Sequence, residues 1–231
     1  MHRPSVRVMS LLTIGVAGCG GGWGMAVPAD VAQESEELKI QDRSSWSGAL
    51  VDESFKLGPY RVTDVDRKWD STRTRSLFEF SDSRTQGGYA FKLGAQDATL
   101  AGDCATEQRE QTKQLGDGAE FSNVVAKLGC ACRNDQDEAT LLLDATTTAQ
   151  YQGSLKGPGY QYQVTALTQR ENGRMASHDP LGYRVDGEGP IGVVGVVKPG
   201  QVWLAKSVPE SARRQLACLF AGLLLYMPPE R

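Results

Sequence analysis

The sequence has few of the residues that most often carry catalysis. Only two of its 231 residues are histidines, His2 and His178, and aromatic residues make up 7%. A serine-histidine-aspartate triad would need His178, and no Gly-x-Ser-x-Gly motif is present to supply the nucleophile. The chain also lacks an excess of basic residues, because its formal net charge is −3. We therefore predict that the protein is not an enzyme of the triad type and that it does not bind nucleic acid.

The sequence contains no apolar run long enough to cross a bilayer as a helix, although it begins with a shorter one. Residues 8–17 are mostly apolar, and Arg3 and Arg7 precede them. A positive region followed by a short apolar stretch is typical of a secretory signal, whereas a membrane-spanning helix needs about 20 apolar residues. We predict that residues 1–18 form a signal peptide that is removed on export.

The end of this segment reads Val16-Ala17-Gly18-Cys19. It resembles the lipobox of bacterial lipoproteins, in which a branched apolar residue and two small residues precede an obligatory cysteine; Val16 replaces the more common leucine. The resemblance implies that Cys19 is the lipidation site: its thiol receives a diacylglyceryl group, the signal is cleaved before it, and the new amino group is acylated. Several acyl chains anchor a protein stably, whereas one chain binds only marginally. The alternative is a plain secretory signal that carries a cysteine near its end by chance.

In the same family, glycine rather than aspartate after the cysteine, here Gly20, implies transfer to the outer membrane. We therefore expect a protein of the bacterial cell envelope, lipid-anchored in the outer membrane and facing the periplasm or the cell surface. The expected partners are the membrane, through the N-terminal lipid, and another envelope protein. Because the rest of the chain is acidic, the lipid rather than a polybasic patch would hold it at the bilayer.

Residues 19–45 predict the lipidated cysteine and a flexible tether. Glycines follow Cys19, residues 29–37 are polar and acidic, and no periodic apolar pattern occurs before Trp46. A coil of about 25 residues has an r.m.s. span of roughly 25–30 Å, which would let a folded domain stand away from the membrane. An amphipathic helix over residues 31–40 is an alternative.

Residues 46–231 predict a single, mainly β domain, built as an antiparallel barrel or sandwich of many short strands. Residues 59–66 and 89–93 alternate apolar and polar side chains. Turn sequences such as Gly157-Pro158-Gly159 and Lys198-Pro199-Gly200 separate further short runs. Many short strands with glycine and proline between them are typical of antiparallel β proteins.

The polar middle of this domain is harder to assign. We expect another strand over residues 76–80 and a turn at Gly87-Gly88. Residues 108–114 show no apolar periodicity, so they are expected to be a helix or a loop.

The end of the chain carries an uncharged apolar run, Leu216–Met227. It predicts a helix at about residues 209–227 that is apolar on every face, too short to span about 30 Å of hydrocarbon, and therefore buried within the strands. Together with the preceding run 192–204 and its Pro199-Gly200 turn, this layout resembles the tubby C-terminal-like fold, which includes the LURP-one-related proteins. The resemblance implies a β-barrel of about twelve strands around the helix. An unrelated β domain with one packed helix is the alternative.

Four cysteines remain besides Cys19, and an exported protein can form disulfides. Cys130 and Cys132 would lie on one face of a strand, where they could not easily bond each other, so Cys104 is expected to pair with one of them. Cys218 is expected to be a free thiol that fills space on the buried helix. A redox role of the Cys130-Ala131-Cys132 sequence is an alternative. Zinc would need four soft ligands, and the sequence after residue 18 has one imidazole, so we expect neither a metal nor a cofactor.

Charged residues supply the remaining candidates. Residues 134–138 are acidic, but they lack the glycine and the distal glutamate of an EF-hand loop, so a solvated turn is expected. Asp64 and Asp66 would share one strand face and are expected to pair with Arg61, Arg67 or Lys68. A basic run that includes Trp69 could bind an anion, although interspersed acidic residues favour a surface of mixed charge. The basic residues are Arg67, Lys68, Arg73, Arg75 and Arg84, and the acidic ones are Asp66, Asp70, Glu79 and Asp82.

These observations favour a non-catalytic, lipid-anchored envelope lipoprotein that serves as a binding or structural module. The alternative is an envelope hydrolase that uses paired acidic residues, as glycoside hydrolases do.

Overall fold

The computed structural model describes most of the chain after its first 23 residues. The described ranges are 24–44, 53–77, 80–95, 98–114, 120–145, 151–171, 173, 176–177 and 179–226. The predicted signal peptide, Cys19 and His178 lie outside them. No helix within these ranges is long and apolar enough to cross a membrane.

Thirteen strands of the described chain form one antiparallel sheet, in the order β1-β13-β12-β11-β10-β9-β8-β7-β6-β5-β4-β3-β2. The strands are β1 (Ser35–Glu37), β2 (Ile40–Gln41), β3 (Phe55–Leu57), β4 (Tyr60–Leu77), β5 (Phe80–Gly94), β6 (Thr99–Gln114), β7 (Glu120–Arg133), β8 (Glu138–Ala145), β9 (Tyr151–Gly157), β10 (Tyr160–Leu167), β11 (Gly182–Asp186), β12 (Pro190–Gly195) and β13 (Gln201–Ala205). Two helices accompany them, α1 (Ala29–Glu34) and α2 (Glu210–Leu225). The mainly β fold class and the C-terminal helix are confirmed.

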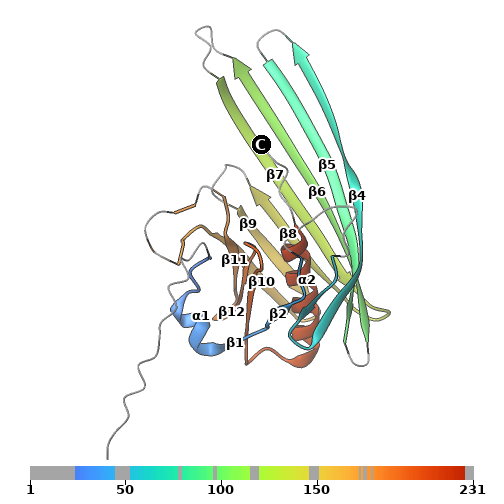
Figure 1. The fold of residues 1–231 in the computed structure, drawn as a ribbon, viewed down its shortest axis with the longest axis vertical. Coiled ribbons are helices and arrows are strands. Elements are labelled where there is room, and N and C mark those ends of the chain that lie inside the picture. The colour runs from blue at the N-terminus through green and yellow to red at the C-terminus, as the bar shows by residue number, and fades with distance from the viewer. Residues whose placement is uncertain are drawn as a thin grey trace, which may run out of the picture.

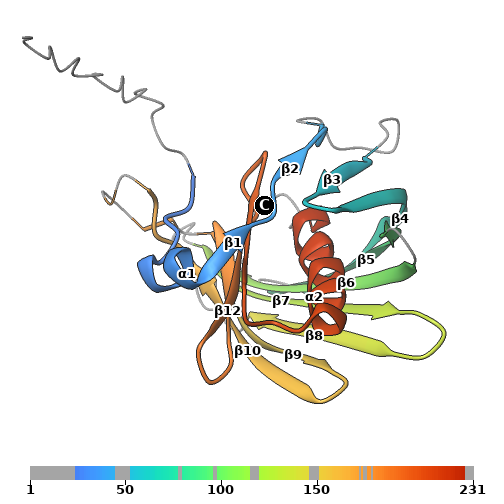
Figure 2. The ribbon, with the colours of Figure 1, turned by 90° about the horizontal axis from the view of Figure 1, so that it is seen from below.

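The sheet curls around α2, as Figure 2 shows. Its two edge strands, β1 and β2, are separated only by Leu38 and Lys39. The Leu38 amide donates to the Val202 carbonyl at 2.8 Å on one side, and the Lys39 carbonyl accepts from the Gly58 amide at 2.9 Å on the other. The two edges of the sheet therefore meet in one short segment, which holds the curl around the helix.

Helix α2 fills the space that the sheet encloses. The hydrophobic side chains from Leu216 to Leu225 are at most 4% exposed. The inward faces of the strands supply alternating apolar residues such as Phe91, Leu128 and Leu204. Burial of one such aliphatic or aromatic side chain stabilises the fold by about 1.5–3 kcal/mol, so this helix is the centre of the core.

The C-terminal end of α2 receives its positive partners from distant parts of the chain. The helix has no basic residue in its own last turn. Arg43 donates to the Leu224 carbonyl, Arg67 donates to the Leu225 carbonyl at 2.9 Å, and the Tyr89 hydroxyl donates to the Gly222 carbonyl at 2.7 Å. These donors satisfy carbonyls that the helix leaves free and oppose the negative end of its dipole. Burial lowers the pKa of Arg43 to about 10, but this value is still well above neutral pH, so the guanidinium stays charged there.

The prediction of a flexible tether over residues 19–45 is wrong for its described part, residues 24–44. Helix α1 lies against the outside of the sheet, where Val31 is fully buried with Met25, Leu181 and Val193. Strand β1 then pairs with β13, and Leu38 reaches the main core. The sequence shows no periodicity here because three widely spaced apolar residues, Met25, Val31 and Leu38, carry the attachment.

Strands β4–β7 continue well beyond the part of the sheet that covers α2, as Figure 1 shows. We call this extension the projecting sheet and define it as residues 68–77, 80–88, 105–114 and 120–127. At about 3.3 Å per residue, its β4 part is roughly 30 Å long. The side chains at 70–76, 81–87 and 105–113 are exposed or partly exposed on both faces of the sheet.

Three predictions fail in the projecting sheet. Residues 76–80 do not form one strand, because the chain reverses there and Leu77 pairs with Phe80. Gly87-Gly88 is no turn but lies within β5, opposite Thr106 and Ala105. Residues 108–114 belong to β6. A strand exposed on both faces needs no alternation of apolar and polar residues, so the pattern that identifies strands is missing.

We predict that Leu224→Asp abolishes stable folding, because Leu224 is 1% exposed and a carboxylate there would be buried without a partner. The free energy of unfolding should fall by more than about 4 kcal/mol. Leu142→Asp is the matched control, since Leu142 is 57% exposed and the same change there should cost less than about 0.5 kcal/mol. Thermal denaturation followed by circular dichroism measures both, and an unchanged melting temperature in Leu224→Asp would contradict the buried position of α2.

Candidate functional site

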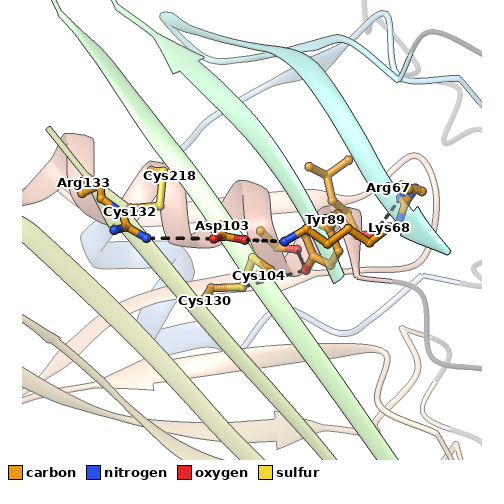
Figure 3. The surroundings of a disulfide bond; sticks show 11 residues. Arg67, Lys68, Tyr89, Asp103, Cys104, Cys130, Cys132, Arg133 and Cys218 are labelled. Carbon is orange, nitrogen blue, oxygen red and sulfur yellow. Dashed lines mark hydrogen bonds and ion pairs between the residues drawn. A yellow bond between two sulfur atoms is a disulfide. The ribbon is translucent and has the colours of Figure 1, made fainter. Parts of the chain in front are cut away.

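The four described cysteines form two disulfides. Cys104 bonds Cys130, and these residues lie directly opposite each other on β6 and β7. Cys132 bonds Cys218 and so joins β7 to α2 (Figure 3). The pairing of Cys104 with one of the two β7 cysteines agrees with the sequence prediction. The prediction of a free Cys218 is wrong, because Cys132 faces inward beside Cys130 and the helix places Cys218 against it.

Both disulfides are buried in the core beneath the projecting sheet. All four cysteines are at most 4% exposed. The helix approaches the Cys104–Cys130 pair at Gly222, where an added Cβ would lie 3.1 Å from the Cys130 sulfur and 3.2 Å from the Cys104 sulfur. Glycine therefore allows this close contact. Because Cys130 and Cys132 each bond a different partner away from solvent, the arrangement favours a structural role over a redox site.

The outside of the sheet at this level carries a line of charges, Lys68, Asp103 and Arg133 (Figure 3). Asp103 lies 3.9 Å from the Lys68 ammonium and 4.0 Å from the Arg133 guanidinium. These exposed pairs are long, so each contributes little to stability.

The outer face of the projecting sheet gathers arginines from three strands. Arg73, Arg84 and Arg109 are register partners on β4, β5 and β6, so they lie in one row across the sheet. Arg75 lies in the next row, opposite Asp82. Side chains of this face line a hollow of about 430 Å³. They are Ser71, Arg73, Arg75, Asp82, Arg84, Gln86, Glu107 and Arg109. We call this surface the arginine face.

Two of the four arginines are paired with carboxylates. Arg109 donates two hydrogen bonds to Asp82, at 3.0 and 2.8 Å, and Arg84 donates to Glu107 at 2.8 Å. The hydrogen bond from Arg109 is the main cause of the lowered pKa of Asp82, and Arg75 and Arg84 add a smaller Coulombic contribution. Neither Arg73 nor Arg75 has an ion pair with another described residue. The arginine face therefore keeps two uncompensated positive charges.

The basic run seen in the sequence is divided between three places, because Lys68 belongs to the line of charges with Asp103 and Arg133. Arg67 does not join the arginine face but lies at the end of α2, where it pairs with Glu53 at 2.6 Å. Asp70 is also absent from this face, since its carboxylate lies over Gly87. The expected mixture of charges is present, but its acidic members are Asp82 and Glu107.

Sequence reasoning missed Arg109 and Glu107. Both belong to β6, whose polar end was expected to be a helix or a loop. The alternate positions Glu107, Arg109 and Gln111 share one face of a strand, so a period of two in the charged residues could have found them.

The acidic candidates of the sequence lie at the surface. Asp64 pairs at 2.8 Å with Lys92, which lies on the neighbouring strand β5 and is not among its expected partners. Two of those expected partners, Arg67 and Lys68, pair instead with Glu53 and Asp103.

Residues 134–138 include a turn between β7 and β8, in which the Asn134 side-chain oxygen accepts hydrogen bonds from the amides of Gln136 and Asp137. Within the described ranges, no group of three or more histidine, cysteine, aspartate or glutamate side chains lies close enough to hold a metal ion.

No family model matches the chain, and neither the curated proteins nor the solved structures include one with significant similarity to it.

We predict that removal of the Cys132–Cys218 disulfide destabilises the protein more than removal of Cys104–Cys130. The first closes a sequence separation of 86 residues and the second one of 26 residues. Loop-closure entropy gives about 4.6 and about 3.5 kcal/mol, respectively. Double alanine variants of each pair, compared by urea denaturation, test the order. The reverse order would show that loop closure does not dominate.

We also predict that Arg109→Gln raises the pKa of Asp82 toward its ordinary value, because the hydrogen bond that favours the carboxylate is lost. Arg75→Gln is the matched control, since it removes only a Coulombic contribution and should raise the pKa less. Titration of the carboxyl carbon by NMR measures both values. An equal rise in the two variants would contradict the assigned cause.

Proposed function

We propose that the protein is a non-catalytic, lipid-anchored module of the bacterial cell envelope, which binds its partner through the projecting sheet. The observation that carries this proposal is a four-stranded extension whose described side chains are mostly polar and are mostly exposed or partly exposed on both faces. Such an extension buries little apolar surface, so its own folding contributes little to stability. An extension that adds little to folding stability and exposes both faces to solvent is suited to contact with a partner.

The filled interior supports a binding role at the surface. Helix α2 occupies the space inside the sheet, and its apolar side chains are packed there. A carrier would need that space for its ligand. The outward surfaces of the sheet are therefore the better candidates for recognition.

The N-terminal contacts support an orientation for the anchored protein. The Gly24 carbonyl accepts from the Glu171 amide at 3.1 Å, and Met25 forms a bridge with Arg170. Cys19 precedes Gly24 by five residues, which reach at most about 18 Å. A lipid on Cys19 would hold the domain close to the bilayer, in contrast to the longer tether expected from the sequence.

The projecting sheet would then point away from the anchoring membrane. Helix α1 and the far ends of β4–β7 lie toward opposite ends of the long axis of the molecule (Figure 1). Because α1 follows Gly24 closely in sequence, the lipid and the projecting sheet would lie at opposite ends. This arrangement suits a module that presents one surface to the space beyond its membrane.

We predict that Cys19→Ala moves the protein from the detergent phase to the aqueous phase in a phase-partition experiment, because no acyl chain can be attached. The wild-type protein should partition with detergent, and its mass should show acyl groups on a chain that begins at Cys19. Gly20→Ala is the matched control, since it alters the neighbouring position and keeps the thiol. An unmodified thiol in the wild-type protein, or unchanged partition of Cys19→Ala, would overturn the anchor.

A further inference from the structure

The arginine face places like charges directly against one another. Arg73, Arg84 and Arg109 are successive register partners on neighbouring strands. Neighbouring strands lie about 4.7–4.9 Å apart, and like charges at opposed positions destabilise a sheet. The projecting sheet has little apolar burial to offset this repulsion. Repulsion within the row therefore lowers the stability of the projecting sheet, and a bound anion would reduce this repulsion.

The charges left over on this face match a dianion. Asp82 and Glu107 accept hydrogen bonds from Arg109 and Arg84, while Arg73 and Arg75 keep their full charge. A phosphate monoester carries a charge of about −1.5 to −2 at neutral pH. One such group would neutralise the face, whereas a single carboxylate would leave one positive charge uncompensated.

The geometry of the two free arginines also suits phosphate. Arg73 and Arg75 are two residues apart on β4, so their Cα atoms lie roughly 6.5–7 Å apart and their side chains share one face. A guanidinium offers a planar fork of donors that fits two phosphate oxygens. Ser71 and Gln86 add a hydroxyl and an amide to the lining of the same hollow, whose volume is about 430 Å³.

We propose that the hollow on the arginine face binds a phosphate monoester, with Arg73 and Arg75 as its direct ligands and Arg84 and Arg109 completing the positive surroundings. The inference rests on the proposed function only in taking the projecting sheet as the binding surface. It does not require the lipid on Cys19. The phosphate could belong to a soluble compound or to a lipid headgroup, and both present the same group to the arginines.

The test is a titration of the full chain with small anions. The protein is purified from the detergent or the aqueous phase, whichever contains it, so the result does not depend on the lipid anchor. Isothermal titration calorimetry at low salt compares inorganic phosphate with succinate, a dicarboxylate of equal charge. We expect phosphate to bind at least tenfold more tightly than succinate. Succinate binding as tight as phosphate binding would overturn the assigned ligand class.

The decisive variant is Arg73→Gln/Arg75→Gln, which should weaken phosphate binding at least tenfold. The matched control is Arg61→Gln/Lys156→Gln, which removes the same charge from two exposed positions elsewhere and should change binding less than twofold. Arg73→Lys/Arg75→Lys keeps the charge and loses the fork, so its affinity should fall between the two. Equal loss in the control variant, or no loss in Arg73→Gln/Arg75→Gln, would overturn the site.

A second readout separates loss of binding from loss of folding. Because Arg73→Gln/Arg75→Gln takes one charge out of the row and one from the position beside it, it relieves repulsion on the arginine face, and its melting temperature without phosphate should be equal to or above that of the wild type. Cosedimentation with phosphatidylcholine vesicles, with and without phosphatidic acid, identifies the source of the phosphate. Binding of either free phosphate or phosphatidic acid supports the site, and binding of neither overturns it.

Discussion

The enclosure of α2 is the constraint on which the rest of the structure depends. A helix that is apolar on every side must be surrounded, and a single sheet surrounds it only if it curls until its edges meet. The segment 35–41 makes that closure possible by pairing with β13 on one side and β3 on the other. The C-terminal end of α2 imposes a second requirement. Its last carbonyls have no partner within the helix and are partly or fully buried, so they need donors from elsewhere in the chain. Arg43, Arg67 and Tyr89 meet it from three separate parts of the chain.

The Cys104–Cys130 disulfide lies where the sheet changes character. On one side of it, β6 and β7 carry apolar residues toward α2. On the other side, residues 105–113 of β6 are exposed or partly exposed on both faces, whereas β7 still buries Leu128 and Ala126 before it enters the projecting sheet. The hydroxyl pairs Thr72–Thr85 and Thr74–Ser83 and the arginine–carboxylate pairs are among the contacts that join the strands there besides the backbone ladder. Each such cross-strand pair contributes about 0.2–1 kcal/mol. The projecting sheet is therefore ordered mainly because its strands continue into the core. The Cys104–Cys130 disulfide joins two of these strands, β6 and β7, where they leave the core.

The sequence predicts the fold well wherever a strand has one face packed on the core and the other face in solvent. Alternation of apolar and polar residues locates the strands around α2, and the ends of the helix predicted at about 209–227 lie within two residues of the observed ones, Glu210 and Leu225. The same logic fails for residues 108–114 and for Gly87-Gly88, because both faces of the projecting sheet are solvated and no alternation is required. It also fails at residues 24–44, which are attached to the domain although the sequence predicts a free tether. The buried apolar residues Met25, Val31 and Leu38 are too far apart in sequence to form a pattern.

The candidate site could be predicted only in part, because it depends on register rather than on composition. Arg73, Arg75 and Arg84 are close in sequence, but Asp66, Asp70 and Glu79 are interspersed among them, and a count of charges suggests cancellation. Pairing between strands decides which charges share a face: it brings Arg109 beside Arg84 and places Asp70 over Gly87. A one-residue shift of β6 would turn Arg109 to the other face and leave Arg73 and Arg84 without the rest of their row. The arginine face is therefore a property of how long strands are aligned, and the buried helix and disulfides at their base fix that alignment.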